Sequence, residues 1–249
     1  AQWRCYWDFG GGMYTDLFVH QLTHMLLALG LKFPRRVVGG GGLYLEYDGR
    51  DVPDVATVVA DYDDGTQVII TATMVNDTPI DEVIRGHTGT IKFTYNGFEI
   101  TPQVLRGAPA PPTRESAGKD GVEVVDAGFD ARRDADTRAL WTHFLECVRS
   151  RNQDTLCPAD LGYAAIATVN LGVDSYRNGK AYFFDKDSGA ASEADESWAK
   201  KWEKVSHSRG KPVHAPGWTA GDEGSLLYPP DYQKLEGPWV DGQDPAKRV

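Results

Sequence analysis

The sequence predicts an α+β domain with a mostly antiparallel open sheet and helices packed on one face. Apolar side chains recur at helical spacing in three segments, residues 15–29, 137–151 and 159–176. Between the first two of these, short runs rich in Val, Ile, Thr and Tyr alternate with polar residues and are joined by turn dipeptides. Consecutive hairpins of this kind form an antiparallel sheet, and we expect about six or more strands.

Length, charge and cysteine content limit the classes of protein to be considered. The 249 residues suffice for one large domain, or for one domain and a tail. A net charge of -10 argues against nucleic acid as a partner, because phosphate binding needs clustered Lys and Arg. No apolar run reaches the roughly 18 residues that cross a bilayer, so we expect a soluble protein without a membrane partner and leave its compartment open. The three cysteines lack a CxxC spacing, which favours neither a disulfide framework nor a zinc site.

A glycine turn followed by a helix is the most informative stretch of the chain. The glycines at 10–12 can take positive φ or let a ligand come close to the backbone. Thr15 is an acceptable N-cap, and Gly30 stands where a helix of this length would end. The spacing therefore predicts a helix from Thr15 to Leu29.

Three polar residues share one edge of this helix. Asp16, His20 and His24 are spaced i, i+4 and i+8, and an imidazole beside a carboxylate suits acid-base chemistry. A metal site is the alternative, but at about 1.5 Å per residue Asp16 and His24 lie roughly 12 Å apart, too far for one ion. We therefore predict no metal. From the spacing alone, a His20 that only satisfies its own hydrogen bonds remains the simpler interpretation.

The strands follow in order after this helix. Residues 34–47 are predicted as a strand with a glycine run at 39–42, which suggests a bulge or a close approach. Residues 55–62 and 66–75 are predicted as a hairpin, because Asp64-Gly65 is a strong turn signal. Further strands are expected at residues 81–85, 89–95, 98–104, 122–125 and 181–184, with Asn96-Gly97 as a turn.

We predict a domain boundary near residue 187. Residues 1–187 would hold the α+β domain, responsible for substrate binding and oligomerisation, with a proline-rich loop at 107–120. Residues 188–249 are polar, with a short helix around Trp198 and Trp202 and then an extended tail rich in Pro, Gly and aromatic residues. In the helix at 137–151 we expect five apolar residues to face inward: Leu140, Trp141, Phe144, Leu145 and Val148.

The turn and helix resemble the glucose-fructose oxidoreductase, inositol dehydrogenase and MocA family (Gfo/Idh/MocA). Its C-terminal substrate domain carries a Gly-Gly-Gly turn and a helix with Asp, three residues, His, two residues and usually another Asp. The glycines at 10–12, Asp16 and His20 match this pattern, and Thr23 occupies its last position. The resemblance covers roughly residues 3 to 185 and includes Asp48–Asp54, Asp61–Gly65, Gly86–Thr90 and Trp141–Arg151.

This resemblance implies the substrate-binding portion of an NAD(P)-dependent oxidoreductase that acts on a sugar or polyol. In the family the histidine, here His20, is the acid or base at the substrate hydroxyl, and the acid one turn earlier, here Asp16, is its partner. A homodimer or higher homo-oligomer through the free sheet face is also implied. The substrate contacts that we expect are Tyr14, Gly11, Gly12, Trp7 and His24.

The cofactor is expected to be NAD or NADP, bound by a nucleotide domain that these residues do not include. Neither glycine cluster has the Gly-x-Gly-x-x-Gly order between a strand and a helix, so no cofactor-binding residue is predicted. The chain begins Ala1-Gln2-Trp3, directly at the substrate domain. We therefore expect a fragment or a shortened protein.

Two other functions remain open from the sequence. A cofactor-independent hydrolase or lyase on glycosides, esters or lactones could reuse His20 as a general base, and a closed pocket around His20 would favour it. A non-catalytic binding or assembly module is the other alternative. It would be favoured if Asp16 and His20 were buried against the chain's own tail.

Overall fold

Short antiparallel strands and amphipathic helices build two units. The structure, a computed structural model, describes residues 2–30, 32–86, 88–95, 97–103, 121–126, 133–194 and 198–209. The first unit is Ala1–Ile80 with Asp130–Ser197, and the second is Asp81–Phe129 with Trp198–Val249. The predictions for loop 107–120, for the turn residue Asn96 and for the tail beyond residue 209 lie outside the described residues. The predicted boundary near residue 187 stays a prediction.

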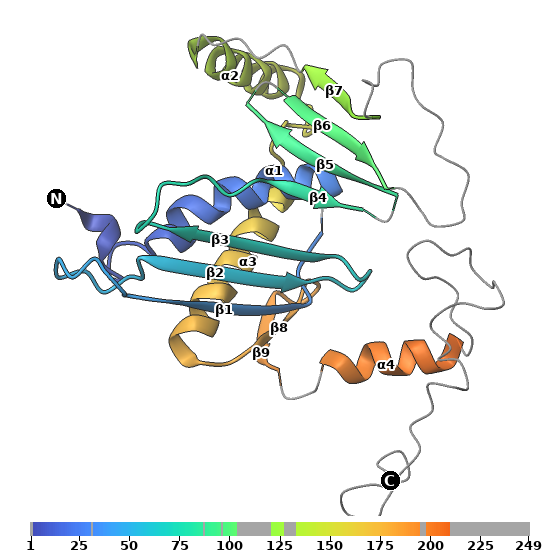
Figure 1. Cartoon of the computed structure of the whole chain (residues 1–249). Helices are drawn as coiled ribbons and strands as arrows, with labels where there is room; N and C mark the ends of the chain where they lie inside the picture. Colours follow the sequence, from blue (N-terminus) through green and yellow to red (C-terminus); the bar gives the residue numbers. More distant parts are fainter. Residues whose placement is uncertain are drawn as a thin grey trace, which may run out of the picture. The chain divides into compact units, whose positions relative to one another are not determined.

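The first unit holds a five-stranded sheet in the order β3-β2-β1-β8-β9, with every neighbouring pair antiparallel (Figure 1). Its strands are β1 (Arg36–Gly42), β2 (Val55–Asp61), β3 (Gln67–Thr73), β8 (Tyr182–Asp185) and β9 (Ala190–Glu193). Its helices are η1 (Trp3–Cys5), η2 (Tyr14–Phe18), α1 (Val19–Leu29), α2 (Arg133–Ser150) and α3 (Ala159–Asn178). The β2–β3 hairpin turns at Asp64-Gly65 as predicted, with φ +89° at Gly65.

The second unit holds a four-stranded antiparallel sheet in the order β4-β5-β6-β7. Its elements are β4 (Val83–Arg85), β5 (Gly89–Thr94), β6 (Gly97–Pro102), β7 (Glu123–Asp126) and α4 (Trp198–Arg209). The predicted α+β class with antiparallel sheets is confirmed. The strands form two sheets, however, and not the single sheet that consecutive hairpins suggested.

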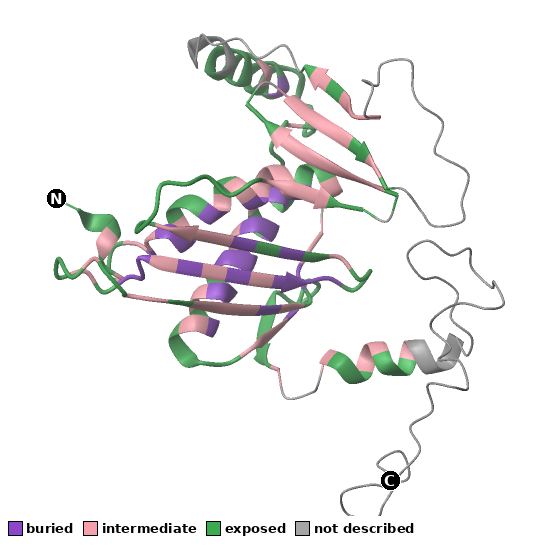
Figure 2. Ribbon diagram, viewed as in Figure 1, coloured by how far each residue is buried: buried purple, intermediate pink, exposed green. Residues whose placement is uncertain are grey.

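One hydrophobic core lies between the inner face of the five-stranded sheet and the helices (Figure 2). Alternate residues of β2 and β3 point into it, as a strand period of two requires. The buried members from the sheet are Val37, Ala56, Val58, Ala60, Val68, Ile70 and Phe184. The helices add Phe18, Leu22, Leu26, Leu161, Ala164, Ala165 and Val169.

Two glycines let α3 lie directly on β1. A Cβ added at Gly39 would stand 1.9 Å from the carbonyl oxygen of Gly172, and one at Gly172 would stand 2.5 Å from Val58 Cγ2. The N–H of Gly39 donates to Ser175 Oγ at 2.8 Å, a hydrogen bond from the strand to the helix. The predicted close approach at the glycine run is thus a contact between helix and sheet.

Three sequence predictions about local structure need correction. The predicted strand at 34–47 ends at Gly42, because the N–H groups that follow bond a buried carboxylate instead of a strand. Strand β9 was missed, since its four residues are exposed and carry no apolar alternation. On α2, the five apolar residues expected to face inward, Leu140, Trp141, Phe144, Leu145 and Val148, are exposed, whereas Cys147 is buried.

None of the helices in the described parts of the chain combines the length and the hydropathy that crossing a membrane demands.

The contact between β1 and α3 can be tested by an alanine substitution. Gly39→Ala would force a methyl group into backbone atoms of α3 that have no rotamer to adopt, so we expect a loss of about 3 kcal/mol or more in the free energy of unfolding. Urea denaturation followed by circular dichroism measures it.

The neighbouring Gly40 is the matched control. No atom lies within 4 Å of a Cβ built there, so Gly40→Ala should change stability by less than about 1 kcal/mol. Equal losses in the two variants would contradict the close approach.

Candidate functional site

The glycine turn is closed by the chain's own side chains. Gly12 has φ +56°, a conformation that favours glycine, and a Cβ there would stand 2.8 Å from Val52 Cγ2. Gly11 is buried, and its N–H donates to Thr15 Oγ1 at 2.8 Å. Thr15 is therefore not the predicted N-cap, since it lies inside the helix and binds the preceding turn. The room left by the missing side chains is filled by Val52 and Thr15.

The helix that carries the candidate acid and base starts as one π-helical turn. Residues Tyr14–Phe18 form η2, and regular α-helix begins only at Val19. In a π turn the hydrogen bonds run from i to i+5, so Asp16 and His20 are not stacked as in the straight α-helix that the spacing predicted. Among the described residues, no hydrogen bond or ion pair joins the two side chains. Turns of this kind are frequent at functional sites.

Asp16 and His20 are both exposed, and only Asp16 has an ionic partner among the described residues. Asp16 Oδ1 accepts a hydrogen bond from Arg4 Nε at 2.8 Å. The imidazole of His20 makes no hydrogen bond within the described part of the chain, and its backbone carbonyl lies 3.3 Å from His24 Nδ1. His20 is thus free to meet a ligand, while His24 is half-buried beside it.

Tyr14 is a core residue. Its side chain is fully buried, and its hydroxyl donates to the Gly40 carbonyl at 2.5 Å. Burial and the neighbouring Tyr176 phenol raise the pKa of Tyr14 well above its usual range. The described structure gives no support to the expected substrate contact at Tyr14, because its hydroxyl is bound inside the fold.

Trp7 lies in a small aromatic group at the end of α3. Its ring is 6.3 Å from the Tyr176 ring, and the Arg177 guanidinium lies 5.0 Å from its centroid. Trp7 is half-buried, so one part of the indole remains available for a ligand. The guanidinium over its face makes this a cation–π contact.

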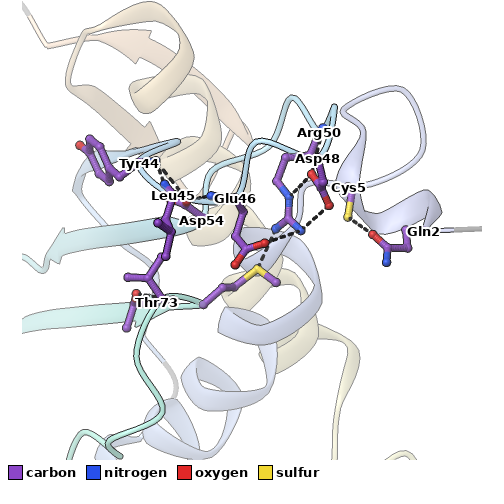
Figure 3. A network of polar contacts seen from close by, with 11 residues as sticks. Gln2, Cys5, Tyr44, Leu45, Glu46, Asp48, Arg50, Asp54 and Thr73 are labelled. Atoms are coloured by element: carbon purple, nitrogen blue, oxygen red, sulfur yellow. Dashed lines mark hydrogen bonds and ion pairs between the residues drawn. The ribbon is translucent and has the colours of Figure 1, made fainter.

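A buried carboxylate organises the loop beside the glycine turn (Figure 3). Asp54 accepts hydrogen bonds from the backbone N–H groups of Tyr44, Leu45 and Glu46 at 2.7 to 3.1 Å. Burial alone would raise the pKa of Asp54, but these donors hold it below its ordinary value. The carboxylate therefore stays charged, and it fixes the loop that follows β1.

This loop is joined to the segment before the glycine turn. The N–H of Trp7 donates to Asp51 Oδ1 at 2.8 Å, and the Cys5 carbonyl accepts from the N–H groups of Asp51 and Val52 at 3.1 and 3.4 Å. Val52 also packs on Gly12. The loop, the turn and the start of the helix thus form one connected structure.

Within the residues that the structure describes, no cluster of three or more His, Cys, Asp or Glu side chains could hold a metal ion. What the exposed site offers is one imidazole, one carboxylate paired with a guanidinium, and an indole. Such groups can exchange a proton with a ligand and hydrogen-bond its hydroxyl groups.

Arg4, Asp51 and Asp54 are the residues that the sequence did not single out. Arg4 lies 12 residues before Asp16, and no local spacing relates them. For Asp54 the sequence does hold one indication of its role. The residue follows a proline and stands directly before a strand, and the short carboxylate of an Asp in such a position can accept hydrogen bonds from nearby backbone N–H groups. The partners of Asp51 and Arg4 follow from the path of the chain in space, which spacing does not reveal.

The fold is shared with solved oxidoreductases and NAD-binding proteins. A NAD-binding protein from Listeria innocua is 15% identical with a TM-score of 0.52, over 74% of this chain and 54% of its own. The WlbA dehydrogenase from Bordetella pertussis, in complex with NADH and UDP-GlcNAcA, is 14% identical with a TM-score of 0.52, over 74% and 49%. An aldose-aldose oxidoreductase from Caulobacter crescentus complexed with glycerol is 16% identical with a TM-score of 0.51, over 74% and 51%.

This chain spans about half the length of those structures. Comparison with curated proteins gives no match. Residues 1–92 match the model of the GFO/IDH/MocA C-terminal domain, and over these residues the resemblance seen in the sequence is confirmed.

The buried carboxylate gives a testable acid dependence. Because the folded pKa of Asp54 lies below the unfolded value of about 3.9, its charge stabilises the fold above that pH, and the stabilisation is lost as the pH falls through the folded pKa. Asp54→Asn should cost about 1–3 kcal/mol at neutral pH and should flatten the decline of stability below about pH 4. Urea denaturation at a series of pH values measures both effects.

Asp8→Asn is the control, since Asp8 is exposed. It should leave the stability and its pH dependence unchanged. An Asp54→Asn variant with the wild-type acid profile would contradict the role given to this carboxylate.

Proposed function

We propose that this chain is the substrate-binding portion of an NAD(P)-dependent oxidoreductase of sugars or polyols, with His20 as its acid or base. The observation that carries the proposal is an exposed imidazole, free of hydrogen bonds among the described residues, on the helix after the glycine turn of a GFO/IDH/MocA C-terminal domain.

In the proposed reaction a hydroxyl-bearing carbon loses a hydride, which carries both electrons, and its hydroxyl group loses a proton. NAD(P), bound outside the described residues, would accept the hydride from carbon. The imidazole of His20 would take the hydroxyl proton, and it would return a proton to the oxygen in the reverse direction. Imidazole suits this exchange because its unperturbed pKa, about 6.5, lies near the pH at which such enzymes work.

Asp16 would act as the partner of His20 in the site. In the described structure its carboxylate is paired with Arg4 at 2.8 Å. Arg4 is itself more than half exposed, so a polar ligand in the site can compete for its guanidinium. Arg4 is therefore a further candidate for binding substrate hydroxyl groups.

The observed exposure does not favour either alternative function. A closed pocket around His20 would favour a hydrolase or lyase, but His20 is exposed. Burial of Asp16 and His20 would favour a non-catalytic module, but within the described residues both side chains are exposed. The expected contacts of Gly11, Gly12, Trp7 and His24 with substrate remain part of the proposal.

A binding experiment tests the site on the 249-residue chain. Neutral sugars and polyols are titrated onto it while the histidine ring signals are followed by NMR. A ligand of the site should shift the His20 signal most and leave that of His143 on α2 in place. A sugar that binds and leaves His20 unshifted would overturn the assignment.

A kinetic experiment tests the chemistry in the protein as its source makes it. With an active sugar or polyol, His20→Ala should lower kcat about 10²–10⁴-fold, since this is the usual contribution of a positioned acid or base. The production of NAD(P)H measures the rate, and His143→Ala is the control. Full activity of His20→Ala would contradict the proposal.

We also propose that the free face of the five-stranded sheet forms a homodimer. The three strands β1, β2 and β3 place Val38, Val59 and Ile69 in one row on this face, and Ile69 is strongly exposed. In a two-fold interface the same patch of both subunits meets, and an apolar row on an uncovered sheet face would suit such a contact.

Ile69→Glu would place a charge in this apolar row, on the edge strand β3, and we expect it to convert a dimer into a monomer. Light scattering during gel filtration measures the mass, against 27.4 kDa for one chain. Leu27→Glu, an equally exposed apolar residue on α1, should leave the dimer intact. A wild-type monomer, or a dimer that survives Ile69→Glu, would contradict this interface.

A further inference from the structure

The loop after β1 exposes three apolar side chains in succession. This tyrosine loop, residues 43–50, carries Tyr44, Leu45 and Tyr47, which are 62%, 60% and 79% exposed. The described chain leaves these three neighbouring side chains largely uncovered. Contiguous apolar surface of this kind marks sites that bind another protein.

The backbone of the tyrosine loop is held firmly although its side chains are exposed. Asp54 binds three consecutive N–H groups of the loop, as described above (Figure 3). Arg50, whose side chain is almost fully buried, binds Asp48 through Nε and Nη2, both at 2.8 Å. The same guanidinium donates to Met74 Sδ at 3.1 Å. Asp54 therefore fixes the first part of the loop, and Arg50 fixes its last part.

The two tyrosine rings are also held in place. Tyr44 donates its hydroxyl proton to the Gly41 carbonyl at 3.2 Å, and Tyr47 donates to the Tyr44 carbonyl at 3.1 Å. A Cβ at Gly42 would stand 2.4 Å from Tyr44 Cζ, so this glycine makes room for the ring. Tyrosines restrained in this way lose little entropy when a partner covers them, and Tyr is enriched among the residues that carry interface energy.

The charge around the loop selects the partner. Between residues 43 and 54 the sequence has four carboxylates and one guanidinium, a net charge of -3, in a chain whose net charge is -10. A second copy of the chain would bring like charges together, and a nucleic acid would be repelled as well. A protein surface rich in Lys and Arg is attracted to it.

We propose that the tyrosine loop docks into an apolar groove, rimmed by Lys and Arg, on another protein. Tyr44, Leu45 and Tyr47 fill the groove, and Glu46 and Asp48 face its basic rim. This interaction goes beyond the proposed oxidoreductase function and does not depend on it.

A random peptide library displayed on phage is the probe. It is selected on the immobilised 249-residue chain after removal of all phage that bind the Tyr44→Ser/Tyr47→Ser variant. We expect the surviving peptides to combine Lys or Arg with large apolar residues. In calorimetry, the strongest peptide should bind Tyr47→Ser and Asp54→Asn at least tenfold more weakly than wild type, and added salt should weaken its binding to wild type.

Tyr95→Ser is the matched control, because Tyr95 is also 79% exposed but belongs to the second unit. It should bind the peptide within twofold of wild type. Any of four results would overturn the proposal: no surviving peptide, peptides that are acidic or lack apolar residues, peptides that copy segments of this chain, or equal binding by wild type and Tyr47→Ser. Tyr47→Ser removes an exposed ring and its hydrogen bond to the Tyr44 carbonyl but leaves the hydrogen bonds of Asp54 in place, so its result does not depend on the stability of Asp54→Asn.

Discussion

The contact of α3 with β1 is the constraint on which the first unit depends. Gly39 and Gly172 bring the two backbones so close that neither position has room for a methyl group. Once α3 is seated there, its buried face covers the inner residues of β2, and α1 packs beside it. The glycine turn and the site helix are positioned by the same core, through the buried side chains of Tyr14 and Phe18. The exposed candidate site is thus supported by a well-packed hydrophobic core.

A network of hydrogen bonds around Asp54 and Asp51 extends from this core to the surface. Asp54 fixes the residues after β1, and Asp51 and Val52 tie the same loop to Trp7, Cys5 and Gly12. Because buried carboxylates are costly unless they are well hydrogen-bonded, a carboxylate with three backbone donors strongly specifies the loop's conformation. The site is therefore flanked by a loop whose backbone is held by hydrogen bonds within the chain.

Local sequence signals predicted what depends on local chemistry. The Asp-Gly dipeptide gave the β2–β3 turn, and the periodic apolar residues gave α1 and α3 nearly to their ends. The division into two sheets was not predictable in this way, since strand order depends on contacts between distant residues. The exposed apolar face of α2 shows the same limit, because amphipathic spacing predicts that a face is apolar without identifying what covers it.

For the candidate site, the sequence located the helix and its exposed histidine but not the surroundings of Asp16. No residue pattern in the sequence indicated the π turn, the pairing of Asp16 with Arg4 or the burial of Tyr14. A π turn can be regarded as an α-helix that holds one additional residue. Removal of a single residue between Tyr14 and Phe18 would turn everything before it by about 100° relative to α1. The alignment of the glycine turn with the edge of the helix that carries His20 thus depends on one residue of chain length. An insertion or deletion here would reorient the candidate site and leave the hydrophobic core beyond Val19 in register.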